Sequence, residues 1–264
     1  MGNSGSLAFA IECSELMKSF RADLHVHTVL SPCAEVEMIP PLIVQTALEH
    51  HIDVIAITDH NATANAAAVQ KAAEGTGLTV LPGMEVQSRE DIHLLTLFET
   101  IEALEAWQAE VDESLPNLPN RPDFFGEQFV VDETGEFIRT EPRLLLTSTS
   151  FSIDEIFERV NSWGGLVIPA YVERTAYGLF PSLGLISEKW NLSALEISRH
   201  TTLEKAAVAF PAVRSYPLIQ SGDVHRLDEF LGTTLFSLDA PTLEEIRMAF
   251  RQIGGRKVCI ESQS

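Results

Sequence analysis

Short apolar runs alternate with amphipathic runs along most of the chain. An apolar residue at every third or fourth position predicts a helix, whereas a short β-branched run between turn residues predicts a strand. Strands are predicted at residues 22–27, 52–60, 78–86, 92–98, 165–172, 192–198, 215–225 and 233–240. Helices are predicted at residues 40–51, 64–77, 100–115, 152–164, 201–210 and 242–255. This alternation favours an α/β fold whose parallel strands close into a barrel, with an open doubly wound sheet as the alternative.

Residues 115–147 interrupt this pattern. Prolines end the preceding helix, and the segment VVDETGEFI at 130–138 indicates a β-hairpin that turns at Glu133, Thr134 and Gly135. We interpret 115–147 as an insertion that decorates the surface beside the barrel, with a lid over a site as the alternative. Residues 1–20 are predicted to be an N-terminal leader with a short helix, and residues 21–264 a single domain.

Composition and charge narrow the setting. With 264 residues, 45% of them hydrophobic, the chain can bury a sizeable core, but no apolar run approaches the roughly 20 residues of a membrane span. We therefore expect no membrane partner. The three cysteines are widely spaced, which favours a reducing, cytoplasmic location over a disulfide framework. The net charge of −20 predicts repulsion of polyanions, so we expect no binding to nucleic-acid duplexes.

Polar side chains gather where the predicted strands end. They are His25 and His27, Asp59 and His60, Glu85, His93, and Asp223 and His225. Reactive groups in barrels lie at such strand ends, and side chains two apart on a strand point to the same side. Imidazole and carboxylate together suit zinc, iron or manganese. The pattern therefore predicts a metal site at one mouth of the fold.

Five segments, in this order, resemble the polymerase and histidinol phosphatase (PHP) superfamily of metal-dependent phosphoesterases. They are DLHVHT, AITDHN, LPGMEV, GGLVIPAY and SGDVHRL. The likeness runs from about Arg21 to the C-terminus. It implies a distorted barrel of about seven βα units that holds two or three divalent metal ions, zinc, manganese or iron, at its mouth.

The resemblance also implies roles for individual residues. It makes His25, His27, Glu85 and Asp223 ligands of one ion. Glu85 would bridge to a second ion, which His93 also holds. A third ion would take His60 and His225, while Asp59 would act in catalysis by orienting His60.

Two positions depart from the pattern of the superfamily. Tyr171 stands where similar proteins carry a histidine ligand of the second ion, and a neutral phenol binds zinc or manganese poorly. Cys33 stands where relatives often carry a histidine or aspartate for the third ion. A thiolate can coordinate zinc, but a small buried residue is an equal alternative for Cys33, and Glu35 or Glu37 could reach the ion instead.

No nucleophile elbow and no phosphate-binding glycine loop occurs in the sequence. We therefore expect a metal-activated hydroxide to attack the phosphorus of a small phosphorylated substrate. Arg174, Arg199 and Arg226 are candidates for binding the phosphate, with solvated ion pairs as the alternative. His200 is a candidate proton donor to the leaving group, with a plain surface histidine as the alternative.

Two other functions remain open. One is a metal-binding domain with weak or no catalysis that acts in regulation, which Tyr171 favours. The other is metal-dependent hydrolysis at carbon, as in amidohydrolase barrels, which share the His-x-His opening. Those barrels usually carry a metal-bridging lysine on a middle strand, and no lysine is placed for that role here. The sequence does not indicate an oligomeric state.

Overall fold

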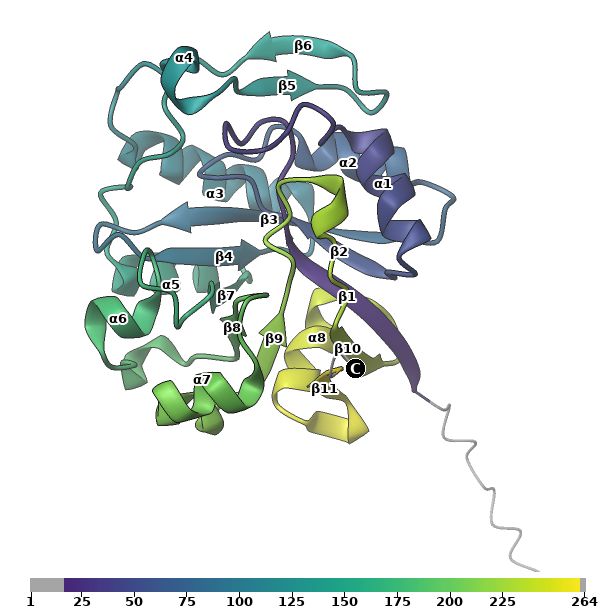
Figure 1. Cartoon of the computed structure of the whole chain (residues 1–264), viewed down its shortest axis with the longest axis vertical. Helices are drawn as coiled ribbons and strands as arrows, with labels where there is room; N and C mark the ends of the chain where they lie inside the picture. The colour runs from purple at the N-terminus through teal and green to yellow at the C-terminus, as the bar shows by residue number, and fades with distance from the viewer. Residues whose placement is uncertain (1–16, 262–264) are drawn as a thin grey trace, which may run out of the picture.

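The structure, a computed structural model, describes residues 17–261. Most of the predicted leader and its short helix, residues 1–16, lies outside this range. The first strand, β1, already begins at Lys18, and it runs through the centre of the molecule (Figure 1).

Seven strands form one curled sheet. In spatial order they are β11 (Lys257–Ile260), β10 (Thr234–Leu238), β1 (Lys18–Val26), β2 (Val54–Ile57), β3 (Thr79–Gln87), β4 (His93–Leu97) and β7 (Leu166–Pro169). β1, β2 and β3 are parallel, while β4 is antiparallel to both β3 and β7. The α/β class is confirmed, but an all-parallel sheet is wrong. Only five residues connect β3 to β4, and a parallel crossover needs a dozen or more.

A second, parallel pair of strands lies beside the ends of the curled sheet. It consists of β8 (Leu195–Ile197) and β9 (Leu218–Gln220). The Val172 amide, just after β7, donates to the Glu196 carbonyl at 2.9 Å. The His27 amide, just after β1, donates to the Val224 carbonyl at 2.9 Å. These bonds bring the ends of β1, β7, β8 and β9 to one side of the molecule. The distorted (β/α)7-type barrel stays a prediction.

Six helices follow the predicted pattern. They are α1 (Pro40–Glu49), α2 (Ala66–Ala73), α3 (Ile101–Ser114), α5 (Ile153–Ser162), α7 (Leu203–Ala209) and α8 (Leu243–Phe250). Four begin at a serine or threonine whose side chain accepts a backbone N–H of the first turn: Thr100, Ser152, Thr202 and Thr242. The short helix α6 (Leu179–Leu183) and strand β11 were not predicted. Within residues 17–261, no helix has the length and apolar character needed to cross a membrane.

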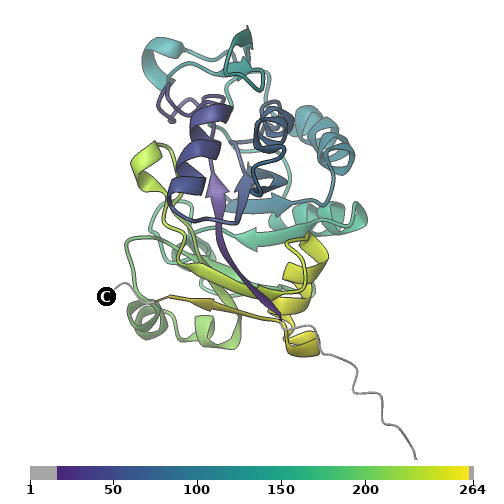
Figure 2. The ribbon, with the colours of Figure 1, turned by 90° about the vertical axis from the view of Figure 1, so that its right-hand side faces the viewer.

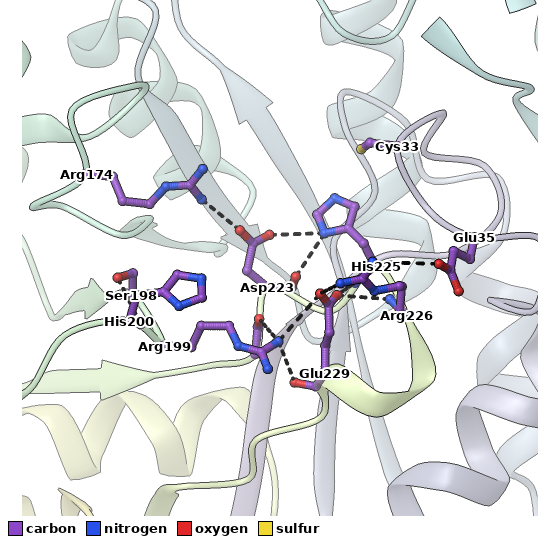
Figure 3. A pocket seen from close by; sticks show the side chains of 11 residues that line it. Cys33, Glu35, Arg174, Ser198, Arg199, His200, Asp223, His225, Arg226 and Glu229 are labelled. Atoms are coloured by element: carbon purple, nitrogen blue, oxygen red, sulfur yellow. Dashed lines mark hydrogen bonds and ion pairs between the residues drawn. The ribbon is translucent and has the colours of Figure 1, made fainter.

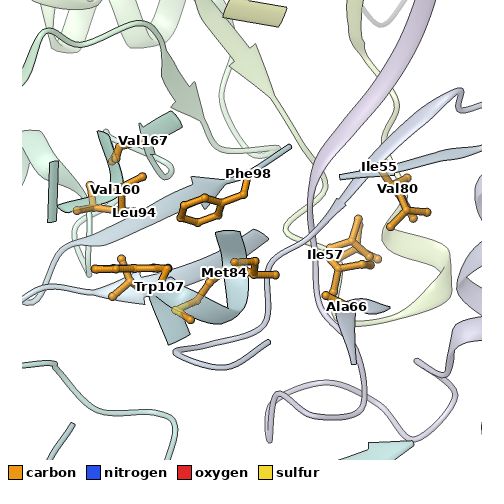
Figure 4. Packing of buried hydrophobic residues seen from close by; sticks show 14 of the residues in the cluster. Ile55, Ile57, Ala66, Val80, Met84, Leu94, Phe98, Trp107, Val160 and Val167 are labelled. Carbon is orange, nitrogen blue, oxygen red and sulfur yellow. The ribbon is translucent and has the colours of Figure 1, made fainter. Parts of the chain in front are cut away.

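The core lies between the sheet and the helices that cover it. Trp107 of α3 is fully buried and packs with Met84 and Phe98 beside β3 and β4 (Figure 4). Ile57 of β2 and Ala66 of α2 belong to the same cluster. Because these side chains lose all contact with water, they fix which face of each strand points inward and where each strand ends.

The insertion at 115–147 contains a short helix and a hairpin. They are α4 (Pro122–Phe125), β5 (Phe129–Val131) and β6 (Phe137–Thr140). The Asp132 side chain accepts the Thr134 and Glu136 amides and so shapes the turn. The insertion lies above the loop that follows β1, and Figures 1 and 2 show it at one end of the molecule.

Gly126 brings the insertion into close contact with that loop. Its φ is +104°, and a Cβ atom there would lie 2.0 Å from the carbonyl oxygen of Pro32. Only glycine can therefore occupy this position without moving one of the two backbones.

We expect Gly126→Ala to lower the free energy of unfolding by about 2 kcal/mol more than Gly75→Ala, measured by urea denaturation. Gly75 is the matched control, since its φ is +76° but a Cβ there meets nothing within 4 Å. Equal losses for the two variants would show that the contact with Pro32 is not a constraint.

Candidate metal centre

A single carboxylate, that of Glu85 on β3, lies at the centre of the candidate site. Oε1 is 2.8 Å from His93 Nδ1 and 3.4 Å from His25 Nε2. Oε2 is 2.9 Å from His60 Nδ1 and 3.4 Å from His27 Nε2. Glu85 is 1% exposed. An ionised carboxylate at such a depth requires positive charge around it, which imidazolium groups or cations can supply.

Asp223 supplies the second carboxylate from the loop after β9. Oδ1 is 3.4 Å from His25 Nε2 and 3.6 Å from His27 Nε2. Its backbone has a φ of +50°, a conformation that aspartate and asparagine adopt more readily than most residues. Strained backbone of this kind is frequent at functional sites.

The spacing of these donor atoms fits a metal ion. Four ligands about 2.1 Å from a tetrahedral ion lie about 3.4 Å from one another. That value agrees with the separations between the imidazoles of His25 and His27 and the two carboxylates. The Nε2 atoms of His25, His27 and His93 and Oε2 of Glu85 are buried without a hydrogen-bond partner. Buried polar atoms are rarely left unpaired, so this set suits a cation.

Three groups of side chains have ligand atoms that lie within 4.8 Å of one another. They are His25, His27 and Asp223; His27, His60 and His225; and His60, Glu85 and His93. The chain therefore has His, Asp and Glu clusters that could hold several divalent ions. The residues predicted as ligands from separate parts of the sequence do meet in space.

Hydrogen bonds behind the two histidines of β1 fix their orientation. His25 Nδ1 donates to the Glu196 carboxylate at 3.0 Å. His27 Nδ1 is 2.9 Å from Ser31 Oγ, whose hydroxyl donates to Asp59 at 2.6 Å. With Nδ1 engaged in both rings, each Nε2 atom points toward the cluster.

Asp59 and Glu196 thus lie one layer behind the cluster. Asp59 also accepts the Thr28 amide and hydroxyl, and it shapes the loop after β1 instead of bonding to the His60 ring. Glu196 was not predicted. A single acidic residue inside the apolar strand β8 was the available signal, because a buried glutamate needs a partner.

The electrostatics prepare several groups as ligands. Burial raises the pKa of Glu85, but the imidazoles of His93, His25 and His60 outweigh burial and hold it well below its usual value. Burial and the neighbouring imidazoles of His225 and His60 hold the pKa of His27 well below 6.5. Glu85 is therefore ionised and His27 neutral, the forms that bind cations.

Tyr171 occupies the edge of the cluster nearest Glu85. Its hydroxyl donates to Glu85 Oε1 at 2.7 Å and contacts His93 Nδ1. Burial and the carboxylates of Glu85 and Asp223 raise the pKa of Tyr171 well above 10, so the side chain is a neutral phenol. Its backbone φ is +29°. The Tyr171 hydroxyl therefore occupies the space between Glu85 and His93 that a bound cation would need.

Cys33 lies beside the opposite edge of the cluster. Burial raises the pKa of its thiol, but contacts with the imidazoles of His60 and His225 outweigh burial and lower it to about 6. Glu35 lines the adjoining cavity, and the Glu37 side chain is exposed. Of the alternatives considered for this position, the Cys33 thiol is the one in contact with ligand imidazoles.

A cavity of about 490 Å³ opens beside the cluster (Figure 3). The three predicted phosphate-binding arginines and His200 all line it. Arg174 donates to Asp223 Oδ2 at 2.9 Å, and Arg199 donates to the carbonyls of Gly222 and Glu229 at 3.2 Å. Arg226 pairs with Glu229 at 3.3 Å. Each arginine is held at the wall of the cavity by an acceptor of the protein.

A second cavity of about 370 Å³ opens on the side of His60 and His93. Tyr177 lines it, with its ring stacked on His93 at 4.3 Å. Phe125 and Leu146 of the insertion also line it. None of these three residues was predicted, because apolar residues in loops and single helical turns carry no periodic signal.

The fold and the cluster together define an α/β domain with candidate metal-binding groups beside a cavity that three arginines line. The chain belongs to the PHP domain family, whose model matches residues 23–163. No curated protein matches the chain. The structure resembles endonuclease Q from Pyrococcus furiosus, a lesion-specific endonuclease, with a TM-score of 0.69 and 19% identity. The match covers 91% of this chain but 58% of the endonuclease.

A second similar structure is described as a metal-dependent phosphoesterase from Bifidobacterium adolescentis. Its TM-score is 0.54 and its identity 18%, and the match covers 86% of this chain and 91% of that one. At identities this low, the two structural matches show that the fold is shared. That fold agrees with a hydrolase of the PHP family.

The prediction that nucleic-acid duplexes are excluded as partners is wrong. The net charge was taken to exclude nucleic-acid duplexes, but endonuclease Q, with this fold, has been solved with a 27-mer duplex that carries an abasic lesion at the active site. The physical reason is that screening limits electrostatic effects to about 10 Å, so charges at a site outweigh the total. Three arginines line the cavity here despite the net charge of −20.

We expect Tyr171→His to raise the bound manganese or zinc by about one ion per chain, because an imidazole replaces the hydroxyl that bonds Glu85. Inductively coupled plasma mass spectrometry, after dialysis against the metal, measures the number of ions per chain. Tyr171→Phe, which removes the hydroxyl but adds no ligand, should show no such gain. Equal contents in all three proteins would contradict the prediction.

We expect Glu196→Gln to weaken metal binding about 10- to 100-fold, because His25 loses its carboxylate partner. Competition with a fluorescent chelator gives the dissociation constants. Glu173→Gln is the control, since the Glu173 carboxylate accepts the Ser198 amide at 3.0 Å and contacts no ligand histidine. Equal affinities for Glu196→Gln and wild type would show that His25 needs no such support.

Proposed function

We propose that the protein is a metal-dependent phosphoesterase that hydrolyses a phosphate ester at the cluster around Glu85 and Asp223. The observation that carries the proposal is the convergence of buried, unpartnered ligand atoms beside a cavity lined by arginines. Neither feature alone is specific, since structural histidine clusters and surface arginines are both common. Together they support a site for cations next to a site for an anion.

The chain would divide the work among three groups of residues. Glu85, Asp223 and the imidazoles of the cluster hold two or three divalent ions, zinc, manganese or iron, with Cys33 favouring zinc on its side. Such ions neutralise phosphate oxygens and lower the pKa of a water molecule toward about 7. Asp59 and Glu196 keep the imidazoles in orientation through their hydrogen bonds.

The arginines and His200 act on the substrate. Arg174 lines both cavities, so its guanidinium can orient a phosphate group lying between them. Arg199 and Arg226 hold further oxygens along the larger cavity. His200, on the same wall, donates a proton to the leaving oxygen as the ester bond breaks.

A second function is favoured by one observation. The hydrogen bond from Tyr171 to Glu85 fills part of the ligand set with a neutral group. A domain that binds fewer ions and turns over slowly, or not at all, would act in regulation. Metal content and turnover separate the two functions.

We expect the protein loaded with manganese or zinc to retain at least two ions and to hydrolyse phosphate esters at about 1 s⁻¹ or faster. The substrates to compare are p-nitrophenyl phosphate, bis(p-nitrophenyl) phosphate and an oligonucleotide duplex with an abasic site. Chelation with EDTA should abolish turnover, and Asp223→Asn should lower kcat about 100-fold or more.

Asp239→Asn is the matched control, because the Asp239 side chain is 42% exposed and pairs with Arg256, which lines neither cavity. It should keep wild-type turnover. Turnover that survives both EDTA and Asp223→Asn would refute the proposed mechanism. One bound ion without turnover of any ester would favour the regulatory function.

A further inference from the structure

The second cavity differs from the arginine-lined one in chemistry and origin. Its walls include Phe125, Leu146 and Tyr177, whereas arginines line the first. The two cavities share Cys33, Arg174, Asp223 and His225, so the metal cluster lies between them. A substrate held at the cluster can therefore extend into both.

We propose that the cavity lined by Phe125, Leu146 and Tyr177 receives the base of a nucleotide whose phosphate lies at the metal cluster. This inference rests on the proposed function and names its substrate class. A nucleotide carries a flat aromatic ring and a phosphate a few bonds apart. The two cavities offer a wall with aromatic residues and a wall with arginines, and they share residues of the cluster.

Tyr177 is built to present its ring to a ligand. One face stacks on His93 with an angle of 17° between the rings, and the His93 amide donates to the Tyr177 carbonyl at 3.1 Å. Tyr177 has a φ of +63°, and 42% of the residue remains exposed at the cavity. A ring fixed on one side and open on another is a stacking platform, and stacking on a base contributes about 1–3 kcal/mol.

The insertion positions the opposite wall. The Phe125 amide donates to the Arg121 carbonyl at 2.9 Å, and the next residue, Gly126, lies against Pro32 in the loop that carries Cys33. Phe125 is thus tied to the same loop that borders the cluster. These contacts favour a role at the site for the segment 115–147 over the surface ornament that the sequence suggested.

Polar groups beside these walls suit a base better than an aliphatic chain. Gln87 lines the cavity, and its amide is held by Asp91 and Ser148 at 3.1 Å. Because Nε2 donates both of its hydrogens to these partners, the amide oxygen of Gln87 is the atom that can accept a hydrogen bond from the edge of a base. A volume of about 370 Å³ lies within the range of small-molecule sites.

The test compares AMP with ribose 5-phosphate, which lacks the base, by calorimetric titration of the manganese-loaded protein. We expect AMP to bind at least tenfold more tightly. Phe125→Ala should weaken AMP about tenfold and change ribose 5-phosphate by less than twofold. Phe137→Ala is the matched control, because this phenylalanine belongs to the same insertion but is 61% exposed and does not line the cavity.

Equal affinity for AMP and ribose 5-phosphate, or equal weakening of both by Phe125→Ala, would overturn the inference, even if the protein hydrolyses phosphate esters. Conversely, a preference for AMP that depends on Phe125, without turnover of any ester, would support the base site and refute the proposed function. A single-stranded DNA of eight nucleotides, titrated in parallel, distinguishes a nucleotide within a strand from a free nucleotide. Tighter binding than AMP indicates a strand, and weaker binding a free nucleotide.

Discussion

The buried carboxylate of Glu85 sets the terms for the rest of the site. Removing one carboxylate from water costs several kcal/mol unless opposite charge and hydrogen bonds replace the lost hydration. Here four imidazoles from β1, β4 and the loop after β2 lie within 3.4 Å of its two oxygens. Behind two of these imidazoles lie further carboxylates: Glu196 bonds directly to His25, and Asp59 accepts from Ser31, which contacts His27. The strand ends must keep their places for these contacts to hold.

Much of the site could be predicted because the strands have a period of two. His25 and His27 share a face of β1, and the turn after β9 carries Asp223 and His225 toward the same point. The strand at β4 was predicted, but its antiparallel direction was not, because its apolar run has the same composition as that of a parallel strand. The sequence also could not predict β11, where four residues with alternating exposure carry little apolar signal.

The residues that escaped prediction have a common physical character. Glu196 and Asp23 are carboxylates inside apolar strands, and their partners come from distant parts of the chain. Asp23 accepts the amides of Gly222, Leu231 and Gly232, and burial raises its pKa to about 6. Phe125 ends the four-residue helix α4 and Tyr177 lies in a turn. The conformation of such short segments depends on tertiary contacts such as the one between Gly126 and Pro32. Local patterns do not encode contacts of this range.

The bonds between β1 and the segment around Gly222 join residues about 200 positions apart. During synthesis, the two histidines of β1 leave the ribosome long before Asp223 is made. Domains fold as units, and contacts of such separation form late. The candidate ligand set is therefore incomplete on the nascent chain until the segment that carries Asp223 has emerged. The emerging polypeptide passes through a period in which its first imidazoles are present without the Asp223 carboxylate that lies beside them in the folded protein.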